Sequence, residues 1–283
     1  MTLRLGILYD RAKWEEKILK REAERRGLKV SMLNILNSVM KVSDGNEFQE
    51  DVYIQRSLSF FKGLYSTAIL EHHGKTVINS YKTSVTCGNK LLTTLALVEH
   101  GVPTPKTFVA FSEEAALKAI EALGYPAILK PIHGSWGRLV AILNDPSSAK
   151  AIIESRAYLH PIHKVFYIQE FVKRPPRDIR SFVIGDRVVA AIYRVAPKGE
   201  WRTNTTIGGR VEVCPITDEL EDLSLKAAEA VGGGMLGVDI MEGDNGLIVH
   251  EVNHVPGFAN TAKVVKQNIP GLMVEYAKEL AKR

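Results

Sequence analysis

Residues 235–254 constrain the fold of this chain more than any other stretch. Positions 249–254 read Val-His-Glu-Val-Asn-His and contain H-E-x-x-H, a pattern that binds zinc when a helix places both histidines on one face. Here β-branched residues precede the pattern and a Pro-Gly pair follows it, which is typical of a strand. Residues 235–241 form a second predicted strand, and the turn-forming link 242–246 joins the two. The sequence therefore predicts a β-hairpin, and not the helix that a zinc protease needs.

The predicted hairpin brings two carboxylates together. Alternate side chains of a strand point to opposite faces, so Glu251 and Asn253 share one face while His250 and His254 take the other. Antiparallel pairing places Asp239 opposite or nearly opposite Glu251, with side chains ~5 Å apart. An all-oxygen set of this kind favours Mg²⁺ or Mn²⁺ over zinc. The alternative is an edge hairpin whose acidic side chains are solvated.

The composition is that of an ordinary globular protein with two or three domains. Hydrophobic residues make up 45% of the 283 residues and charged residues 24%, and no apolar run is long enough for a transmembrane helix. The N-terminus lacks the features of a signal peptide, and Cys87 and Cys214 form no CxxC pair, so we expect a cytoplasmic location. A net charge of +5 suits anionic ligands or an acidic partner, although a solvated basic surface explains it equally well.

Strand and helix patterns intermix along the whole chain. Before residue 89, strands are expected at 3–9, 29–33, 52–55 and 77–79, and helices at 14–26 and 60–71. Hairpins become frequent after residue 107. The fold class is therefore α/β (α+β) with mixed sheets. Glutamates interleave with the basic residues of the first helix, which argues against a nucleic-acid-binding stripe.

Two lysines stand where strands or helices begin or end. Lys130 closes the apolar strand 126–131, and the loop Gly-Ser-Trp-Gly at 134–137 follows it. Glycines let backbone N–H groups approach an anion, and a lysine supplies a point charge for phosphate. Lys90 begins a helix, where anions are also favoured. A hairpin turn with a surface lysine remains the alternative for Lys130.

Familiar nucleotide motifs are missing from the sequence. Residues 232–237 match G-x-G-x-x-G, but they follow a predicted helix and precede a strand, which is the reverse of the dinucleotide-binding order. No Walker-type P-loop is present. Arginines instead gather in the part of the chain that also holds the carboxylate hairpin, namely Arg177, Arg180, Arg194 and Arg202. Together they suit a polyphosphate and a carboxylate substrate, although each arginine taken alone is typical of a protein surface.

The spaced elements, taken in order, resemble the ATP-grasp superfamily and its RimK-like branch. They run from Lys90 through Ile-Leu-Lys-Pro at 128–131, Gly-Ser-Trp-Gly at 134–137, Gln-Glu-Phe-Val at 169–172 and Arg-Asp-Ile-Arg at 177–180 to Asp239 and Glu251-Val-Asn253. The resemblance covers roughly residues 85–265 and is looser before them. It implies an ATP-grasp fold with an N-terminal α/β pre-ATP-grasp domain (1–88), a central lid domain (89–170) and a C-terminal mixed-sheet domain with the metal site (171–283).

The resemblance also implies ATP and Mg²⁺ as cofactors, with two Mg²⁺ ions expected and Mn²⁺ as an alternative. ATP would lie between two sheets, with its phosphates on the lysines and under the loop, its adenine near residues 169–172 and its ribose on Asp178. The expected nucleotide-binding residues are Lys90, Lys130, Gly134, Ser135, Trp136, Gly137, Gln169, Glu170, Phe171, Val172 and Asp178. Asp239, Glu251 and Asn253 would bind the metal ions.

The implied reaction activates a carboxylate. A carboxylate attacks the γ-phosphate of ATP to give an acyl phosphate and ADP, and an amine then attacks the acyl phosphate. Positioning and charge neutralisation supply most of the catalytic effect, and no side chain acts as a covalent nucleophile. The residues expected to hold the carboxylates and the tetrahedral oxyanion are Arg180, Arg194, Arg202 and Asn204.

Within this branch, Trp-Arg-Thr-Asn at 201–204 and the segment 256–261 look like the LysX/ArgX group. Enzymes of that group join an amino acid to the C-terminal glutamate of a small acidic carrier protein, LysW. Gly-Phe-Ala-Asn at 257–260 is of the type associated with glutamate and arginine biosynthesis, whereas a Glu-Phe start is associated with α-aminoadipate and lysine biosynthesis. The expected substrate-binding residues are Arg194, Asn204, Gly257, Phe258, Asn260 and Thr261.

Several alternatives stay open at this point. The alternatives are a ligase that uses α-aminoadipate or both amino acids, and a RimK-like enzyme that adds glutamate to a ribosomal protein. A nucleotide-binding module without catalysis is disfavoured because the metal-binding set is intact. Arg56 and Asn79 are expected either to line the acceptor channel or to have a structural role. The resemblance also implies a homodimer or homotetramer, with neither nucleic acid nor membrane as a partner.

Overall fold

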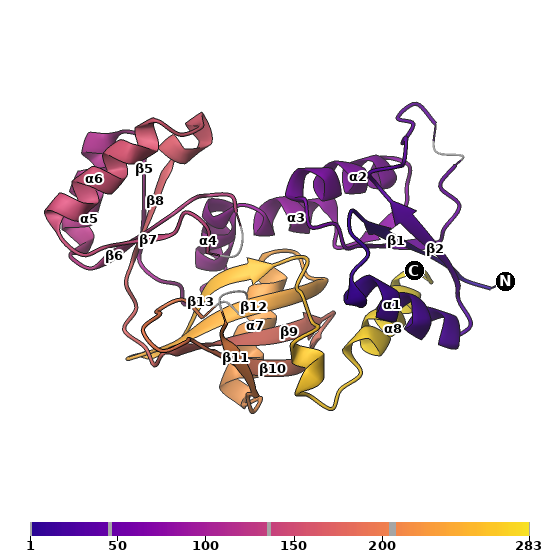
Figure 1. Ribbon diagram of the computed structural model, residues 1–283. Coiled ribbons are helices and arrows are strands. Elements are labelled where there is room, and N and C mark those ends of the chain that lie inside the picture. Colours follow the sequence, from indigo (N-terminus) through magenta and orange to yellow (C-terminus); the bar gives the residue numbers. More distant parts are fainter. Residues whose placement is uncertain (1, 45–46, 135–136, 204–207, 283) are drawn as a thin grey trace.

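The computed structural model describes residues 2–44, 47–134, 137–203 and 208–282, and its strands form three sheets (Figure 1). The N-terminal sheet is parallel throughout, with the strand order β2-β1-β3-β4. Its strands are β1 (Arg4–Tyr9), β2 (Lys29–Asn34), β3 (Val52–Gln55) and β4 (Thr76–Ile78). The helices that connect or follow these strands are α1 (Trp14–Arg25), α2 (Phe60–His72) and α3 (Tyr81–Cys87).

Residues 81–87 form α3 although no helix is expected there from the sequence. The side chain of Ser80 accepts a hydrogen bond from the backbone N–H of Thr83, which caps the first turn. The helix is short, and the signal that marks it is this single cap. It leads directly to α4 (Lys90–Glu99), whose own cap is Asn89. The position of Lys90 at the start of a helix is therefore confirmed.

The central part of the chain projects away from the rest as a separate layer (Figure 1). Its antiparallel sheet has the order β5-β8-β6-β7, and two helices cover it through a core of its own that includes Ile120, Leu143, Ile153 and Phe166. The elements are β5 (Thr107–Ala110), α5 (Glu113–Leu123), β6 (Ala127–Lys130), β7 (Ala141–Leu143), α6 (Pro146–Ala157), a 3₁₀ turn (Pro161–Lys164) and β8 (Phe166–Glu170).

A second antiparallel sheet, β11-β10-β9-β12-β13, carries the predicted hairpin. Helix α7 packs against β9, β10, β12 and β13, so the apolar side chains on that face are buried. The opposite face looks toward the central layer. The elements are β9 (Arg177–Ile184), β10 (Arg187–Val195), β11 (Arg210–Val213), α7 (Asp218–Ala230), β12 (Met235–Gly243) and β13 (Gly246–Asn253).

The predicted hairpin is confirmed, with one correction. Asp239 pairs directly with Glu251, as expected. The register then shifts, because Ile240 pairs with Val249 and His250 is left as an extra residue in β13. This β-bulge interrupts the alternation of side chains. The prediction that His250 lies on the face opposite Glu251 is therefore wrong, since both residues line the same cavity.

The last helix, α8 (Ile269–Leu280), follows a 3₁₀ turn (Thr261–Lys263) and returns to the N-terminal sheet. It packs against α1 and β3, and its residues Met273 and Val274 share a buried cluster with Leu5 and Ile54. Ion pairing between Arg26 and Glu275 joins the two helices at the surface. The first and last segments of the chain thus form one core.

Two polar side chains connect the N-terminal sheet with β12 and the segment after β13. Asn79 accepts a hydrogen bond from the N–H of Met235 (2.6 Å) and donates to the carbonyl oxygens of Met235 and His254. Arg56 is buried against Glu16 and donates to the carbonyl oxygen of Pro256 (3.0 Å). Arg56 and Asn79 were expected either to line the acceptor channel or to have a structural role, and these contacts support the structural role. Among the described residues, no helix is long and apolar enough to cross a membrane.

Candidate active site

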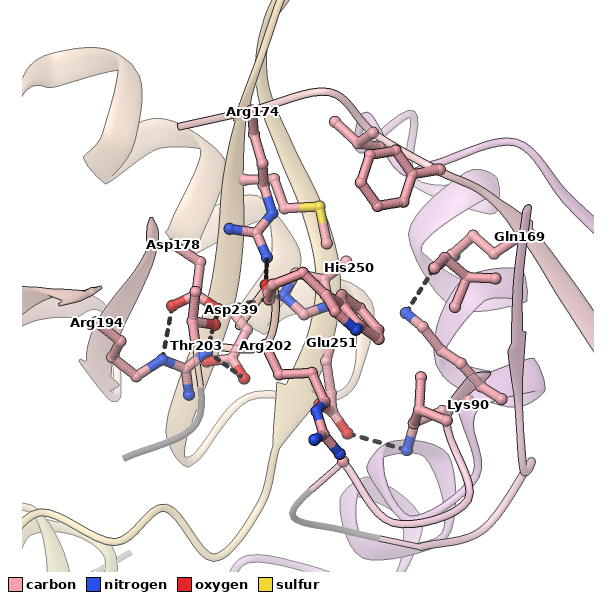
Figure 2. Close-up of a pocket in the computed structure, with 18 of the residues that line it drawn as sticks. Lys90, Gln169, Arg174, Asp178, Arg194, Arg202, Thr203, Asp239, His250 and Glu251 are labelled. Carbon is pink, nitrogen blue, oxygen red and sulfur yellow. Dashed lines mark hydrogen bonds and ion pairs between the residues drawn. The ribbon is translucent and has the colours of Figure 1, made fainter. Parts of the chain in front are cut away.

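A cavity lies between the central layer and the C-terminal sheet, and Figure 2 shows the side chains that line it. Strands β6 and β8 contribute from one side, and β9, β10, β12 and β13 from the other. We call it the nucleotide cavity because the expected nucleotide-binding residues gather there. Those among its lining are Lys90, Lys130, Gly134, Gly137, Gln169, Glu170, Phe171, Val172 and Asp178, while Ser135 and Trp136 lie outside the described residues.

The two expected phosphate-binding lysines both reach this cavity. The ammonium group of Lys90 lies 3.0 Å from Glu251 Oε1 and donates to the carbonyl oxygen of Gly134. Lys130, at the end of β6, donates to Gln169 Oε1 at 2.6 Å. Burial, opposed by Glu251 and assisted by Lys90, lowers the pKa of Lys130 to about 8. An anionic ligand beside Lys130 would raise its pKa again and so favour the positively charged form.

Asp239 is a buried carboxylate of the site. Both of its oxygens accept hydrogen bonds from Arg180 on the neighbouring strand β9, at 2.7 and 2.6 Å. Arg194 on β10 lies 3.2 Å from Oδ2. Burial opposes ionisation of this buried carboxyl, but Arg180 and Arg194 outweigh it and hold the pKa of Asp239 below its usual range. Asp239 is therefore an anion fixed by two guanidinium groups.

Glu251 and Asn253 complete the oxygen-donor set that the hairpin predicts. Glu251 faces Asp239 across the β12–β13 pair, and Asn253 Nδ2 lies 3.2 Å from Asp239 Oδ2. Burial pushes the pKa of Glu251 upward, yet the nearby Lys90 makes the net shift downward despite the repulsion from Asp239. Two ionised carboxylates and an amide at adjacent positions fit a hard cation such as Mg²⁺, which takes its remaining ligands from phosphates and water. Among the described residues, no three His, Cys, Asp or Glu side chains are arranged so that together they could hold a metal ion.

His250 is a member of the site that the sequence alone did not reveal. The bulge turns it into the nucleotide cavity, where Nε2 lies 3.9 Å from Asp178 Oδ2. Its ring nitrogens are buried and have no hydrogen-bond partner among the described residues. Burial, followed by the charge of Lys130, lowers the pKa of His250 to about 3. A neutral ring with a free donor and a free acceptor faces the space that a ligand would occupy.

Asp178 and the arginines expected to act in catalysis form two separate groups. Asp178 accepts a bidentate pair from Arg194 (2.7 Å to each oxygen) and a hydrogen bond from the hydroxyl of Thr203. Arg202 lines the same cavity but is paired with Glu200, at 2.7 Å. Asn204 lies outside the described residues. Arg180 and Arg194 thus contact Asp239 of the carboxylate hairpin, whereas Arg202 lies on a separate segment and pairs with Glu200.

A second cavity adjoins the first, between the C-terminal sheet and the N-terminal unit. The two cavities share Lys90, Gly134, Arg194 and Glu251. We call the second one the acceptor cavity. Its lining also includes Arg180 and Asn253, and it therefore begins at the carboxylate hairpin.

The expected substrate-binding residues divide between the acceptor cavity and the core. Gly257, Asn260 and Thr261 line the acceptor cavity. The side chain of Phe258 is instead 1% exposed and packs against Trp14 and Arg56 in the core shared with the N-terminal sheet. Segment 256–261 therefore presents its small and polar residues to the cavity, while its aromatic residue anchors it.

Several residues of the acceptor cavity come from segments that the sequence did not point to. They are supplied by α1, by the loop before α2, by α2 itself and by the loop after β6, and include Glu15, Ser57, Leu58, Phe60, Phe61 and His133. The hydroxyl of Ser57 is buried and has no hydrogen-bond partner within the described ranges. None of these residues stands in a recognisable motif, so only the three-dimensional arrangement identifies them.

Comparisons with known proteins agree with this geometry. Residues 87–277 match the RimK-like ATP-grasp domain, and residues 5–86 match the LysX preATP-grasp domain. The chain is 39% identical to the α-aminoadipate–LysW ligase LysX of Saccharolobus solfataricus, over 96% of this chain and 99% of the relative. It is 35% identical to the glutamate–LysW ligase ArgX of Sulfurisphaera tokodaii, over 98% of this chain and 99% of that protein.

The fold is likewise shared with a solved ligase. The ATP-grasp ligase PsnB, in complex with a minimal precursor, Mg and ADP, superposes with a TM-score of 0.76 at 20% identity, over 98% of this chain and 97% of PsnB. The predicted α/β fold of the ATP-grasp type is thereby confirmed. The chain belongs to the RimK-like ATP-grasp ligases, in the group of LysX and ArgX.

Proposed function

We propose that this chain ligates an amino acid to the C-terminal glutamate of a small acidic LysW-type carrier protein, with ATP as the energy source. The membership of the family makes it an ATP-dependent carboxylate–amine ligase. The observation that carries the proposal is the meeting of the nucleotide cavity and the acceptor cavity at Lys90, Arg194 and Glu251. A phosphoryl group bound at this junction is reachable from both sides. The unpaired cysteines favour a cytoplasmic location for the reaction.

ATP binds in the nucleotide cavity in this proposal. Lys90 and Lys130 hold its phosphates, Glu170 and the backbone of Phe171 and Val172 meet the adenine, and Asp178 lies where the ribose is expected. The side chain of Asp178 is paired with Arg194, so it is pre-oriented by two charge-assisted hydrogen bonds. Asp239, Glu251 and Asn253 hold Mg²⁺. A metal ion held by these three residues would supply charge neutralisation for the phosphates of ATP.

The chemistry proceeds in two steps in the acceptor cavity. The side-chain carboxylate of the carrier's terminal glutamate attacks the γ-phosphorus, and ADP leaves. The α-amine of the amino acid, as a free base, then attacks the acyl carbon, and the tetrahedral adduct collapses to an amide and inorganic phosphate. Arg180 and Arg194 face this cavity with charges fixed by Asp239 and Asp178, which suits them to carboxylate and oxyanion oxygens. Positioning, and not covalent catalysis, supplies the rate enhancement.

For the amino acid we propose glutamate. Gly257 lines the acceptor cavity without a side chain, and a Cβ at this position would come within 3.7 Å of Glu15 Oε1. This part of the acceptor cavity therefore combines a residue without a side chain with the nearby carboxylate of Glu15. α-Aminoadipate is the second candidate, because the identity to the LysX relative exceeds that to the ArgX relative. The two substrates differ by one methylene, which apolar pockets discriminate by only ~10–200-fold.

Intact-mass spectrometry tests the proposal. LysW of Sulfurisphaera tokodaii is incubated with this enzyme, ATP and Mg²⁺, with glutamate and α-aminoadipate in separate reactions. A mass gain with glutamate alone supports the proposed acceptor, and a gain with α-aminoadipate transfers the assignment to that substrate or to both. Absence of any gain, in the presence of bound ATP, would overturn carrier ligation as the function.

A further inference from the structure

Aromatic rings form a continuous wall from the carboxylate hairpin to the molecular surface. His254 directly follows β13, and its ring lies 5.8 Å from that of Phe60. Phe60 contacts Phe61 at 5.1 Å between centroids, and Phe61 stacks on Tyr65 at 6.2 Å. His133 flanks both phenylalanines, at 5.5 and 6.0 Å. We call the set His254, Phe60, Phe61 and Tyr65 the aromatic wall.

The inner end of the aromatic wall lies in the acceptor cavity and its outer end is exposed. His254, Phe60 and Phe61 line the cavity. Phe61 is nevertheless 54% exposed and Tyr65 58% exposed, on successive turns of α2. Large aromatic side chains that are this exposed and contiguous mark binding surfaces in soluble proteins. The wall therefore continues the acceptor cavity outward, beyond the space that a free amino acid occupies.

The inner part of the wall is rigidly supported. A Cβ placed on Gly88 would lie 1.9 Å from the ring of Phe60, so this ring packs directly on the backbone before Lys90. The ring of His133 is hydrogen-bonded to the carbonyl oxygen of Gly88 at 2.7 Å. The wall is thus built onto the same turn that positions a phosphate-binding lysine. An occupant of the wall would be held in register with the reacting phosphate.

Charge and spacing indicate the kind of occupant. Free glutamate carries two carboxylates, for which aromatic rings provide no hydrogen-bond or ion-pair partner. An extended peptide advances ~3.3 Å per residue, so each ring-to-ring step corresponds to between one and two residues. The first two turns of α2 carry Lys62 and no carboxylate, and α3, which packs against α2, carries Lys82. A peptide from an acidic protein fits this apolar and basic surface.

We propose that the aromatic wall is the docking track for the C-terminal tail of the acidic carrier protein, which it guides from the surface to the carboxylate hairpin. This inference rests on the proposed function and adds the surface that selects a protein tail over a free amino acid. Phe61 and Tyr65 supply its exposed part, and Lys62 attracts the acidic carrier. Exposed rings with limited rotamer freedom are effective anchors of this kind.

The test compares two double variants, each of which removes one phenylalanine ring and one tyrosine ring from a different part of the surface. Phe61→Ala/Tyr65→Ala removes the outer wall. Phe111→Ala/Tyr158→Ala is the matched control, with rings that are 75% and 91% exposed in the central layer, away from both cavities. Steady-state ligation is measured with S. tokodaii LysW, with the free amino acid and with ATP varied in turn. Thermal unfolding of each variant checks that the fold is retained.

Removal of the outer wall is expected to raise the KM for LysW by about tenfold or more, with changes below about twofold in the KM for ATP and for the amino acid. The matched control is expected to leave all three constants unchanged. Lys62→Glu provides a second variant that keeps both rings, and it should raise the KM for LysW more strongly at low salt.

Two outcomes would overturn the docking track. One is an unchanged KM for LysW in both wall variants while the wild-type enzyme ligates LysW. The other is an increase in the KM of the free amino acid alone, which would make the wall part of the amino acid site. A wild-type enzyme that fails to ligate LysW at all would instead contradict the proposed function, so the two failures are distinguishable.

Discussion

The nucleotide cavity and the acceptor cavity share the carboxylate hairpin but are constructed in different ways. The nucleotide cavity lies between two sheets, and its charged side chains are mostly paired with one another, as in Arg194–Asp178 and Arg202–Glu200. The acceptor cavity is assembled from α1, α2, loops and the segment after β13, and it combines aromatic rings with unpaired polar groups such as Ser57. Side chains on paired strands are fixed by backbone register, whereas loop side chains are free to differ between relatives. The nucleotide cavity therefore suits ATP, which is the same in every relative, and the acceptor cavity suits a substrate that differs between relatives.

The largest effect is expected from a change of Glu251, which lines both cavities. Glu251→Gln keeps the shape of the side chain but removes a charge that Lys90 compensates and that the proposed metal site needs. We expect ADP formation and ligation to fall by about 10³-fold or more. Coupled assay of ADP release measures the effect, and Glu114→Gln, on the exposed surface of α5, is the control. Full activity of Glu251→Gln would disprove the metal assignment.

A change confined to the nucleotide cavity should separate the two sites. Lys130→Met removes the ammonium group at the end of β6 and is expected to raise the KM for ATP by about 10–100-fold, with little change for LysW. The pKa of Lys130 is lowered to about 8, so its charge is present below that pH and lost as the pH rises through it. ATP binding to the wild type should therefore weaken between pH 7 and pH 9.

The variant Lys130→Met should lose this pH dependence along with its affinity. Isothermal titration calorimetry with ATP at several pH values measures both. Lys118→Met, on an exposed face of α5, should behave as wild type. A pH profile that is identical in wild type and Lys130→Met would assign the dependence to another group.

A change confined to the acceptor cavity should have the opposite selectivity. Gly88→Ala places a methyl group on the ring of Phe60, which must move from its site. Overpacking of this kind costs about 1–3 kcal/mol of unfolding free energy, and we expect the KM for LysW to rise several-fold and by more than the KM for ATP. Gly63→Ala in α2, whose nearest neighbour would be Gln55 at 3.4 Å, is the control for stability. Chemical denaturation and ligation kinetics together decide the outcome.

The smallest effect is expected at the residue that bears on amino acid choice. Gly257→Glu introduces a carboxylate beside Glu15 and into the acceptor cavity. We expect a shift of the ratio of kcat/KM for glutamate and α-aminoadipate by about 3–30-fold, because the change acts on one end of the substrate. The ratio is measured in competition by mass spectrometry. Gly257→Ala, which adds no charge, should leave the ratio near that of the wild type.

Sequence patterns predicted the nucleotide cavity far better than the acceptor cavity. Asp239, Glu251 and Lys130 stand on or at the ends of strands whose apolar pattern and turn residues are clear in the sequence, and backbone pairing then fixes their positions. His250 was placed on the wrong face because a bulge adds one residue to β13, and the sequence has no signal for it.

The acceptor cavity depends on contacts between distant segments. Phe60, Phe61 and Glu15 lie on helices without a recognisable motif, and they meet segment 256–261 only because the N-terminal unit docks on the C-terminal sheet. Phe258 shows the opposite error, because it was expected in the cavity and lies in the core. Its motif suggested a substrate contact, but its side chain fills the core between the units. No local pattern distinguishes these two uses of an aromatic residue.

The position of α8 has a consequence for how the protein is made. A ribosome releases the strands of the N-terminal sheet first, yet residues 269–280 supply part of the apolar cover of β1 and β3. During synthesis that face stays open until residues 269–280 have been translated. A chain that stops before residue 269 would retain every proposed ATP and metal residue and still lack a closed first domain. The N-terminal sheet therefore cannot complete its apolar core before residues 269–280 are present, although these residues lie far from it in the sequence.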